Sequence, residues 1–149
     1  MLFRSVKAKA LLAKAGYPNG KGFPKIVLQI NSAGGERNSQ IAEVIQKSLK
    51  DVLNINVEIT TVPFAEHIDA YQSGKIDFFR AGWVADYPDP QTFLQLLYGK
   101  LVPANAGENS FTNSSRFVNT AFDSLFNAAQ RERSEEHTSE LQSQSTISY

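Results

Sequence analysis

The chain has 149 residues, of which 15 are Lys or Arg and 15 are Asp or Glu, so its formal net charge is zero. This balance excludes the basic surface of a nucleic-acid-binding protein, and the absence of cysteine excludes disulfides and thiolate metal sites. No apolar run reaches the roughly 18–20 residues that cross a bilayer. We therefore expect neither a nucleic-acid partner nor a membrane span.

Helical and strand patterns alternate along the chain. Apolar residues at every third or fourth position predict helices, and short β-branched or alternating runs predict strands. In chain order, we expect a helix at 6–15, a strand at 26–30, a helix at 39–53, a strand at 55–61, a helix at 64–72, a strand at 76–81, and helices at 91–98 and 117–130. This order predicts an α/β fold with a β-α-β-α-β core and mostly parallel strands.

The last of these helices closes the core in this scheme. Its apolar side is predicted to consist of Ala121, Phe122, Leu125 and Ala129. Because no repeat or linker interrupts the pattern before it, the elements are expected to share a single core.

The corner between the third strand and the helix after it carries the only tryptophan of the chain and an acidic turn. Residues 80–90 read Arg-Ala-Gly-Trp-Val-Ala-Asp-Tyr-Pro-Asp-Pro. Trp83 and Asp86 therefore follow a strand at its carboxyl end, where open α/β sheets bind ligands. Asp86 could also be an Asx-turn residue, and Trp83 a core residue. Asp89 is predicted to cap the next helix, with Pro90 at its first position.

An enzyme is the competing class of function. The chain has no Gly-x-Ser-x-Gly elbow, no phosphate loop ending in Gly-Lys-Ser/Thr and no Gly-x-Gly-x-x-Gly. Gly34 and Gly35 before a helix could hold an anion, although a plain turn explains them as well. His67 is predicted to lie at the surface, and Asp69 and Asp77 lack partners at metal-ligand spacing. We therefore expect no enzyme, no metal and no cofactor.

The corner resembles one protein family closely. Extracellular solute-binding proteins of peptide-type ABC importers carry Gly-Trp-x-x-Asp-Tyr-x-Asp-Pro followed by Phe-Leu, and residues 82–94 fill every one of those positions. Residues 8–17, 41–50, 55–57 and 122–125 resemble further motifs of that family, in the same order. The resemblance implies part of the C-terminal lobe of a two-lobed, periplasmic-binding-protein-like fold, with the first lobe outside this chain.

The resemblance also implies roles for individual residues. In peptide-binding members, the aspartate of Trp-x-x-Asp pairs with the α-amino group of the ligand, a role that would fall to Asp86; nickel-binding relatives lack it. Trp83 would line the cleft, and Arg80 stands where some oligopeptide binders hold the peptide's C-terminal carboxylate. Otherwise Arg80 is a strand residue paired inside the protein. The remaining expected ligand-binding residues are Gly82, Tyr87 and Asn31.

The function implied by the resemblance is the capture of peptides by their N-terminal ammonium and backbone in an interlobe cleft. The partners would be a small peptide and the permease subunits of an ABC importer, with ATPase subunits behind them. We expect a monomer that is periplasmic or a cell-surface lipoprotein. The alternatives are a member of the same family that binds nickel, haem, a sugar or glutathione, or a fragment of an α/β enzyme.

Both ends of the chain resemble translated sequencing adapter. Residues 133–143 match the translation of a common short-read adapter, residues 147–149 match its continuation after a sample index, and residues 1–5 match its reverse complement. A natural polar tail is the alternative. We expect 1–5 and 133–149 to be adapter-derived, with 133–149 disordered, and 6–132 to be the lobe fragment. That stretch keeps 13 basic and 12 acidic residues, a net charge near +1.

Overall fold

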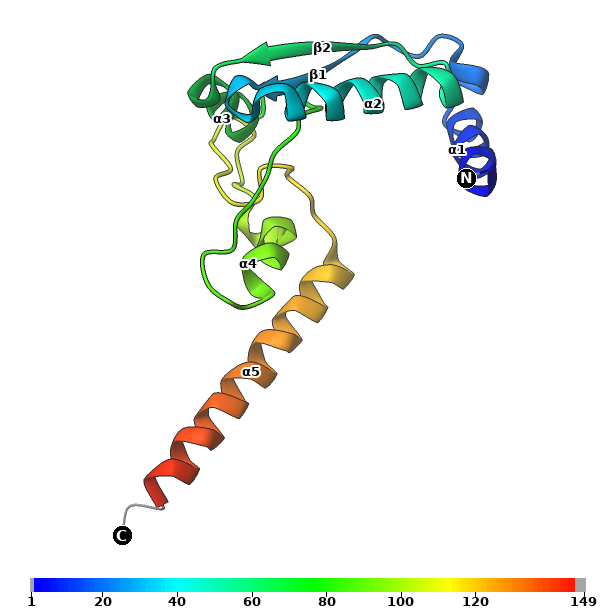
Figure 1. Ribbon diagram of the computed structural model, residues 1–149. Helices are drawn as coiled ribbons and strands as arrows, with labels where there is room; N and C mark the ends of the chain where they lie inside the picture. Colours follow the sequence, from blue (N-terminus) through cyan, green and yellow to red (C-terminus); the bar gives the residue numbers. More distant parts are fainter. Residues whose placement is uncertain (1, 147–149) are drawn as a thin grey trace. The chain divides into compact units, whose positions relative to one another are not determined.

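The chain divides into two compact units, which are described separately (Figure 1). The first comprises residues 1–71 and 75–82, and the second comprises residues 72–74 and 83–149. The structure is a computed structural model that describes the backbone of residues 2–146 and the side chains of residues 4–133.

The first unit is a parallel β-α-β element with further helices. Its elements are α1 (Leu2–Lys14), η1 (Pro18–Gly20), β1 (Ile26–Asn31), η2 (Ser32–Gly34), α2 (Gly35–Leu53), β2 (Val57–Val62) and α3 (Phe64–Gln72). The two strands pair in parallel, with Ile26 opposite Val57 and Asn31 opposite Val62. The long helix α2 connects them, as a parallel pair requires. The α/β fold class and the parallel pairing are confirmed.

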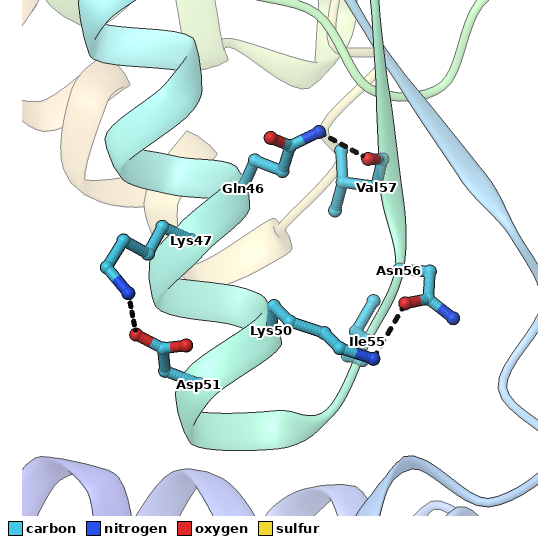
Figure 2. Close-up of a pocket in the computed structure, with 7 residues that line it drawn as sticks. All are labelled: Gln46, Lys47, Lys50, Asp51, Ile55, Asn56 and Val57. Atoms are coloured by element: carbon cyan, nitrogen blue, oxygen red, sulfur yellow. Dashed lines mark hydrogen bonds and ion pairs between the residues drawn. The ribbon is translucent and has the colours of Figure 1, made fainter.

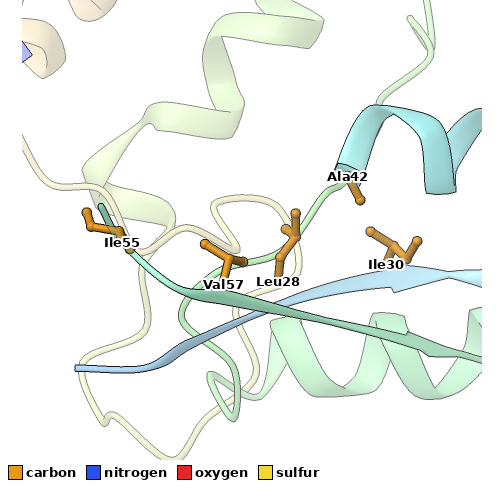
Figure 3. Packing of buried hydrophobic residues seen from close by; sticks show 5 residues of the cluster. All are labelled: Leu28, Ile30, Ala42, Ile55 and Val57. Atoms are coloured by element: carbon orange, nitrogen blue, oxygen red, sulfur yellow. The ribbon is translucent and has the colours of Figure 1, made fainter. Parts of the chain in front are cut away.

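The core of this unit lies between the sheet and α2 (Figure 3). Leu28 and Ile30, two residues apart on β1, point to the same side, and each is 1% exposed. Ala42 of α2 is fully buried against them, and Ile55 and Val57 complete the cluster. Burying a Leu or Ile side chain contributes about 1.5–3 kcal/mol, so this cluster stabilises the unit.

His67 is buried under the sheet, and its predicted surface position is wrong. It lies in α3 and is 1% exposed. Its Nδ1 lies 3.1 Å from Nε2 of Gln29, and its Nε2 lies 3.0 Å from the carbonyl oxygen of Arg80. Because an amide nitrogen donates and a carbonyl accepts, Nδ1 accepts from Gln29 Nε2 and Nε2–H donates to the carbonyl of Arg80. Both ring nitrogens are thus satisfied, which allows the imidazole to be buried.

The predicted third strand, 76–81, is reduced to a single bridge. Gln29 N donates to Phe78 O at 3.0 Å, and Arg80 N donates to Gln29 O at 3.1 Å, so Phe79 pairs in parallel with β1. Within the first unit this segment has a strand on one side only, which leaves it with half the backbone partners of an interior strand. The position of the strand was therefore predicted correctly, but its regular length was not.

The turn before α2 is closed by a side chain of the helix itself. Asn38 is 5% exposed and its Nδ2 lies 3.4 Å from the carbonyl oxygen of Asn31. The side chain packs so closely on Gly34 that a Cβ there would lie 1.8 Å from Asn38 Nδ2. The glycine is needed for this contact, which supports the plain-turn interpretation over an anion site.

The second unit has little regular structure before its long helix. Its elements are α4 (Gln91–Leu94), η3 (Gln95–Leu97), η4 (Gly99–Leu101) and α5 (Thr120–Thr146). The helix predicted at 91–98 is thus split into one α-helical turn and one 3-10 turn. The last helix starts three residues later than predicted.

The inward face of α5 is half polar, which the apolar pattern did not predict. Phe126 is 8% exposed, and its ring centroid lies 4.6 Å from that of Tyr98. Beside it, Asp123 Oδ1 accepts from Gly99 N at 2.9 Å and Asn127 Oδ1 accepts from the Tyr98 hydroxyl at 2.6 Å. Because these polar residues occupy the buried side, three residues of the predicted apolar side are exposed: Ala121, Leu125 and Ala129.

A fully buried asparagine holds the loop that precedes α5. Asn113 Nδ2 donates to Tyr98 O at 3.1 Å and to Phe117 O at 2.7 Å. Its Oδ1 accepts from Phe117 N at 3.1 Å and from Ser115 Oγ at 3.0 Å. The amide therefore makes all of the hydrogen bonds that it can make, and it ties the loop to both of its ends.

The C-terminal segment continues α5, and its first residue makes a contact. The backbone is helical to Thr146. Arg133 Nη1 donates to Asp89 Oδ2 at 2.6 Å and Nη2 donates to Gln91 Oε1 at 2.9 Å. Arg133 therefore contacts Asp89 and Gln91, and the expected disorder of residues 133–149 stays a prediction. The side chains of residues 1–3 and 134–149 lie outside the described part, so the adapter origin of both ends stays a prediction.

Candidate functional site

Three side chains of the predicted corner meet at one hydroxyl group in the second unit. Trp83 and Asp86 lie in the turn before α4, and Thr92 is the second residue of that helix. Thr92 Oγ1 lies 3.3 Å from Trp83 Nε1, 3.2 Å from the backbone nitrogen of Asp86 and 3.3 Å from Asp86 Oδ2. Thr92 itself is 0% exposed.

The directions of these hydrogen bonds are fixed by chemistry. An indole N–H and a backbone N–H can only donate, so Thr92 Oγ1 accepts from Trp83 and from the Asp86 backbone. Its own proton is then left for Asp86 Oδ2. The hydroxyl therefore accepts two hydrogen bonds and donates one, and the acceptor of the donated bond is one carboxylate oxygen of Asp86. Sequence reasoning missed Thr92, because no sequence pattern marks hydrogen bonds to residues nine and six positions away.

The carboxylate of Asp86 is otherwise open to solvent. Asp86 is exposed, and among residues 4–133 no Lys or Arg forms an ion pair with it. Trp83 beside it is 42% exposed, which argues against the interpretation of Trp83 as a core residue. Tyr87 is 38% exposed. The corner thus presents a carboxylate without a cation, next to partly exposed aromatic side chains.

Asp89 holds the start of α4, but it lies one residue before the cap position that was predicted for it. Its Oδ1 accepts from Gln91 N at 2.7 Å. Pro90 occupies the cap position rather than the first helical one. The backbone N–H of Gln91, followed by the Arg133 guanidinium, lowers the pKa of Asp89. Asp89 is thus engaged on both oxygens, whereas Asp86 is not.

The other predicted site residues belong to the first unit. Arg80 is half-buried, and its backbone is held by Gln29 and His67. Its guanidinium has no hydrogen-bond or ion partner among residues 4–133, so the alternative of an internal pair finds no support. A Cβ on Gly82 would meet nothing within 4 Å, so nothing in this chain requires glycine there. Asn31 ends β1, and its carbonyl accepts from Asn38.

A surface hollow between α2 and β2 is not a comparable site (Figure 2). It encloses about 390 Å³, but its polar groups bind one another. Lys47 pairs with Asp51 at 2.7 Å, Lys50 donates to Asn56 Oδ1 at 2.9 Å, and Gln46 donates to the carbonyl of Val57 at 2.7 Å. Each of these polar side chains thus already binds a neighbour through at least one atom.

Among the residues that the structure describes, no group of three or more His, Cys, Asp or Glu side chains could hold a metal ion. Between residues 2 and 146, no helix combines the length and apolar character needed to cross a membrane.

Sequence comparison identifies relatives over most of the chain. The family of bacterial extracellular solute-binding proteins, family 5 Middle, matches residues 3–104. The periplasmic murein peptide-binding protein MppA of Escherichia coli is 34% identical over 128 residues, which cover 86% of this chain and 22% of that protein. The heme-binding protein A of Haemophilus influenzae is 30% identical over 141 residues, which cover 95% of this chain and 24% of that protein.

Solved structures agree with this assignment. The unliganded open form of MppA has a TM-score of 0.68 at 34% identity, over 84% of this chain and 22% of its own. The periplasmic binding protein DppA of Helicobacter pylori, in complex with the peptide STSA, has a TM-score of 0.68 at 33% identity, over 85% of this chain and 24% of its own. This chain thus spans about a fifth to a quarter of the length of these relatives.

The family match extends over more than half of the chain, and it includes the corner with Trp83 and Asp86. The structural matches confirm the predicted partial lobe of a periplasmic-binding-protein-like fold. The chain belongs to the bacterial extracellular solute-binding proteins, family 5.

Proposed function

We propose that this chain is part of the C-terminal lobe of a two-lobed protein that captures peptides for an ABC importer, and that Asp86 binds the peptide's N-terminal ammonium. The observation that carries this proposal is the state of the Asp86 carboxylate. It is exposed, has no cation among residues 4–133, and is held by Thr92 through one oxygen only. A second oxygen is therefore available to a ligand.

The physical basis is the behaviour of a charge pair as water leaves it. A carboxylate and an ammonium attract weakly in water and much more strongly once a second lobe closes over them. Trp83, 42% exposed beside the carboxylate, offers an apolar face to a peptide without selecting a particular side chain. Such a site favours a free N-terminus over a particular sequence.

Arg80 is the proposed counterpart for the other end of a peptide. Its guanidinium has no acceptor among residues 4–133, although its backbone is fixed by Gln29 and His67. A guanidinium binds a carboxylate through two parallel hydrogen bonds. Gly82, Tyr87 and Asn31 are proposed to line the ligand, with the open space around Gly82 allowing close approach of a backbone.

The rest of the protein would cover apolar surface that this chain leaves open. Large hydrophobic side chains are exposed in both units, among them Val44 at 65%, Val84 at 86% and Phe111 at 66%. A neighbouring lobe of the complete protein would bury side chains of this kind. We propose that residues 6–132 are the lobe fragment and that the ends are adapter-derived. The complete protein is proposed to be periplasmic or lipid-anchored, monomeric, and to dock on permease subunits backed by ATPases.

Haem is the second ligand to test, because one relative is named a heme-binding protein. Haem iron needs an axial ligand such as histidine. The histidine among residues 4–133, His67, is 1% exposed and uses both ring nitrogens. The described part of this chain therefore offers haem iron no free histidine nitrogen.

Calorimetry on the complete protein tests the proposal. Trialanine is expected to bind, and N-acetyl-trialanine to bind far more weakly, because acetylation removes the ammonium. Haem, nickel and glutathione are the comparison ligands, and no binding is expected from haem or nickel. Tight binding of haem or nickel without binding of trialanine would contradict the proposal.

A further inference from the structure

We infer that Thr92 is a positioning residue of this site, whose hydroxyl group sets the carboxylate of Asp86 and the indole of Trp83 in one fixed arrangement. This inference rests on the proposed function of Asp86. Thr92 would touch no ligand, because it is 0% exposed. Its effect on binding would pass entirely through its two neighbours.

The hydroxyl group of Thr92 has no hydrogen-bonding capacity left over. Two donors, Trp83 Nε1 and Asp86 N, lie 3.3 and 3.2 Å from Thr92 Oγ1, and the acceptor Asp86 Oδ2 lies at 3.3 Å. A hydroxyl has one proton and two lone pairs, so all of its capacity is used. Rotation of the hydroxyl would break a bond to Asp86 Oδ2 without offering the proton another acceptor.

Among residues 4–133, no other side-chain hydrogen bond or ion pair holds the Asp86 carboxylate or the Trp83 indole. The Asp86 carboxylate has no ion pair among residues 4–133, and the Trp83 ring is in no aromatic pair there. Both groups are on an irregular segment between Gly82 and α4, where backbone structure alone would leave them free to turn. Thr92 therefore replaces the missing regular structure by side-chain hydrogen bonds.

The consequence is a carboxylate presented with one oxygen engaged and the other free. A ligand ammonium would then meet an acceptor whose direction is fixed before binding. Preorganisation of this kind raises affinity because less freedom is lost when the ligand binds. It would also keep the ammonium next to the aromatic face of Trp83.

Two variants separate the hydroxyl from the shape of the side chain. Thr92→Val has nearly the same shape but no hydroxyl, and Thr92→Ser keeps the hydroxyl. Trp83 is the only tryptophan of the chain, so the indole N–H gives a single signal in a nitrogen–proton NMR spectrum of this chain. In the wild type, its exchange with water should be slower than in free tryptophan.

The expected spectroscopic result is faster exchange and a shifted indole signal in Thr92→Val, with wild-type behaviour in Thr92→Ser. A wild-type indole proton that exchanges as fast as in free tryptophan would overturn the inference. That measurement needs no variant, so the inference stays testable even if Thr92→Val folds poorly.

Binding to the complete protein provides the second readout. Thr92→Val should lose about tenfold in affinity for trialanine, as expected for a hydrogen bond to a charged group, and should lose little for N-acetyl-trialanine. Thr92→Ser should bind as the wild type does. Equal losses in both variants, or none in Thr92→Val, would overturn the inference.

The proposed function is tested separately by Asp86→Asn in the same protein. If Asp86→Asn weakens trialanine binding and Thr92→Val does not, the positioning role fails and the proposed function stands. If trialanine does not bind, or if Asp86→Asn does not weaken its binding, the proposed function fails. The proposed effect of Thr92 on binding then fails with it.

Discussion

The two units of this chain are stabilised in different ways. In the first, Leu28, Ile30 and Ala42 bury apolar surface between a parallel sheet and α2. In the second, Phe126 is the buried large apolar side chain among the described residues, and polar side chains bind the backbone of loops. Asn113 and Asp123 hold the loop and the 3-10 turn next to α5. Stability in the first unit comes from burial, and in the second from hydrogen bonds.

This difference in stabilisation bears on where ligand-binding residues can lie. A loop without regular secondary structure can adopt one fixed conformation when buried amide and carboxylate side chains form hydrogen bonds with its backbone groups. Trp83, Asp86 and Thr92 belong to this second kind of structure. The candidate site is thus held by the same type of interaction as the unit around it.

The largest effect is expected in the apolar core of the first unit. Leu28→Ala should lower the free energy of unfolding of that unit by about 2–5 kcal/mol, because it leaves a cavity next to Ile30 and Ala42. Val27→Ala on the same strand is the control, since Val27 is 45% exposed. Urea unfolding followed by circular dichroism measures both. Equal losses would contradict the assignment of the core to one side of β1.

The matching change in the second unit removes a polar anchor. Asn113→Ala should destabilise that unit by about 2–4 kcal/mol, because two carbonyls and one backbone N–H lose a buried partner. Hydrogen exchange by mass spectrometry should show faster exchange in residues 98–119. The exposed Asn105 provides the control variant, Asn105→Ala, with little expected change. Unchanged exchange in Asn113→Ala would show that the loop is held by other contacts.

The predictability of the two units differs for the same physical reason. Apolar periodicity located β1, α2, β2 and α3 to within a few residues, because burial repeats with the period of each element. It failed for α5, where Asp123 and Asn127 face inward while Leu125 is 73% exposed. It also misplaced His67, since nothing in a sequence shows that Gln29 will satisfy a buried ring nitrogen.

The residues of the candidate site were likewise only partly predictable from the sequence. Trp83 and Asp86 were found through their position after a strand and through the resemblance to a family. Thr92 was not, because its role depends on three-dimensional contacts with residues nine and six positions away. Side-chain hydrogen bonds, unlike apolar burial, produce no repeating pattern of residues in the sequence.

A smaller effect is expected at the contact between η4 and α5. A Cβ on Gly99 would lie 2.6 Å from Asp123 Oδ2, so Gly99→Ala must displace the carboxylate that accepts from Gly99 N. The expected loss in the free energy of unfolding is about 1 kcal/mol, at the low end for overpacking. Gly107→Ala, where a Cβ meets nothing within 4 Å, should cost less in the same thermal melts. The reverse order would rule out the close approach.

The smallest effect concerns alkaline pH in the first unit. Burial raises the pKa of Tyr71 above its usual value of 10.0. The folded state then holds this proton more tightly than the unfolded state. Its contribution to stability is complete below pH 10 and is lost as the pH rises through the raised pKa.

The Tyr71→Phe variant isolates this contribution, because the ring stacked on Phe79 is kept and the phenol is removed. Denaturation at pH 9 and pH 11 should show a smaller difference in the variant than in the wild type. Identical differences in the two proteins would mean that Tyr71 does not contribute to the pH dependence.

The most direct test of the proposed function combines Asp86→Asn with acetylation of the peptide in the complete protein. Removing one member of a buried charge pair costs about 2–5 kcal/mol, a loss of roughly thirty- to several-thousand-fold in the affinity for trialanine. Acetylation should weaken binding severely in the wild type and far less in Asp86→Asn, because the pair is already broken there. Equal losses from acetylation in both proteins would contradict the account and leave Asp86 as a structural residue of the turn.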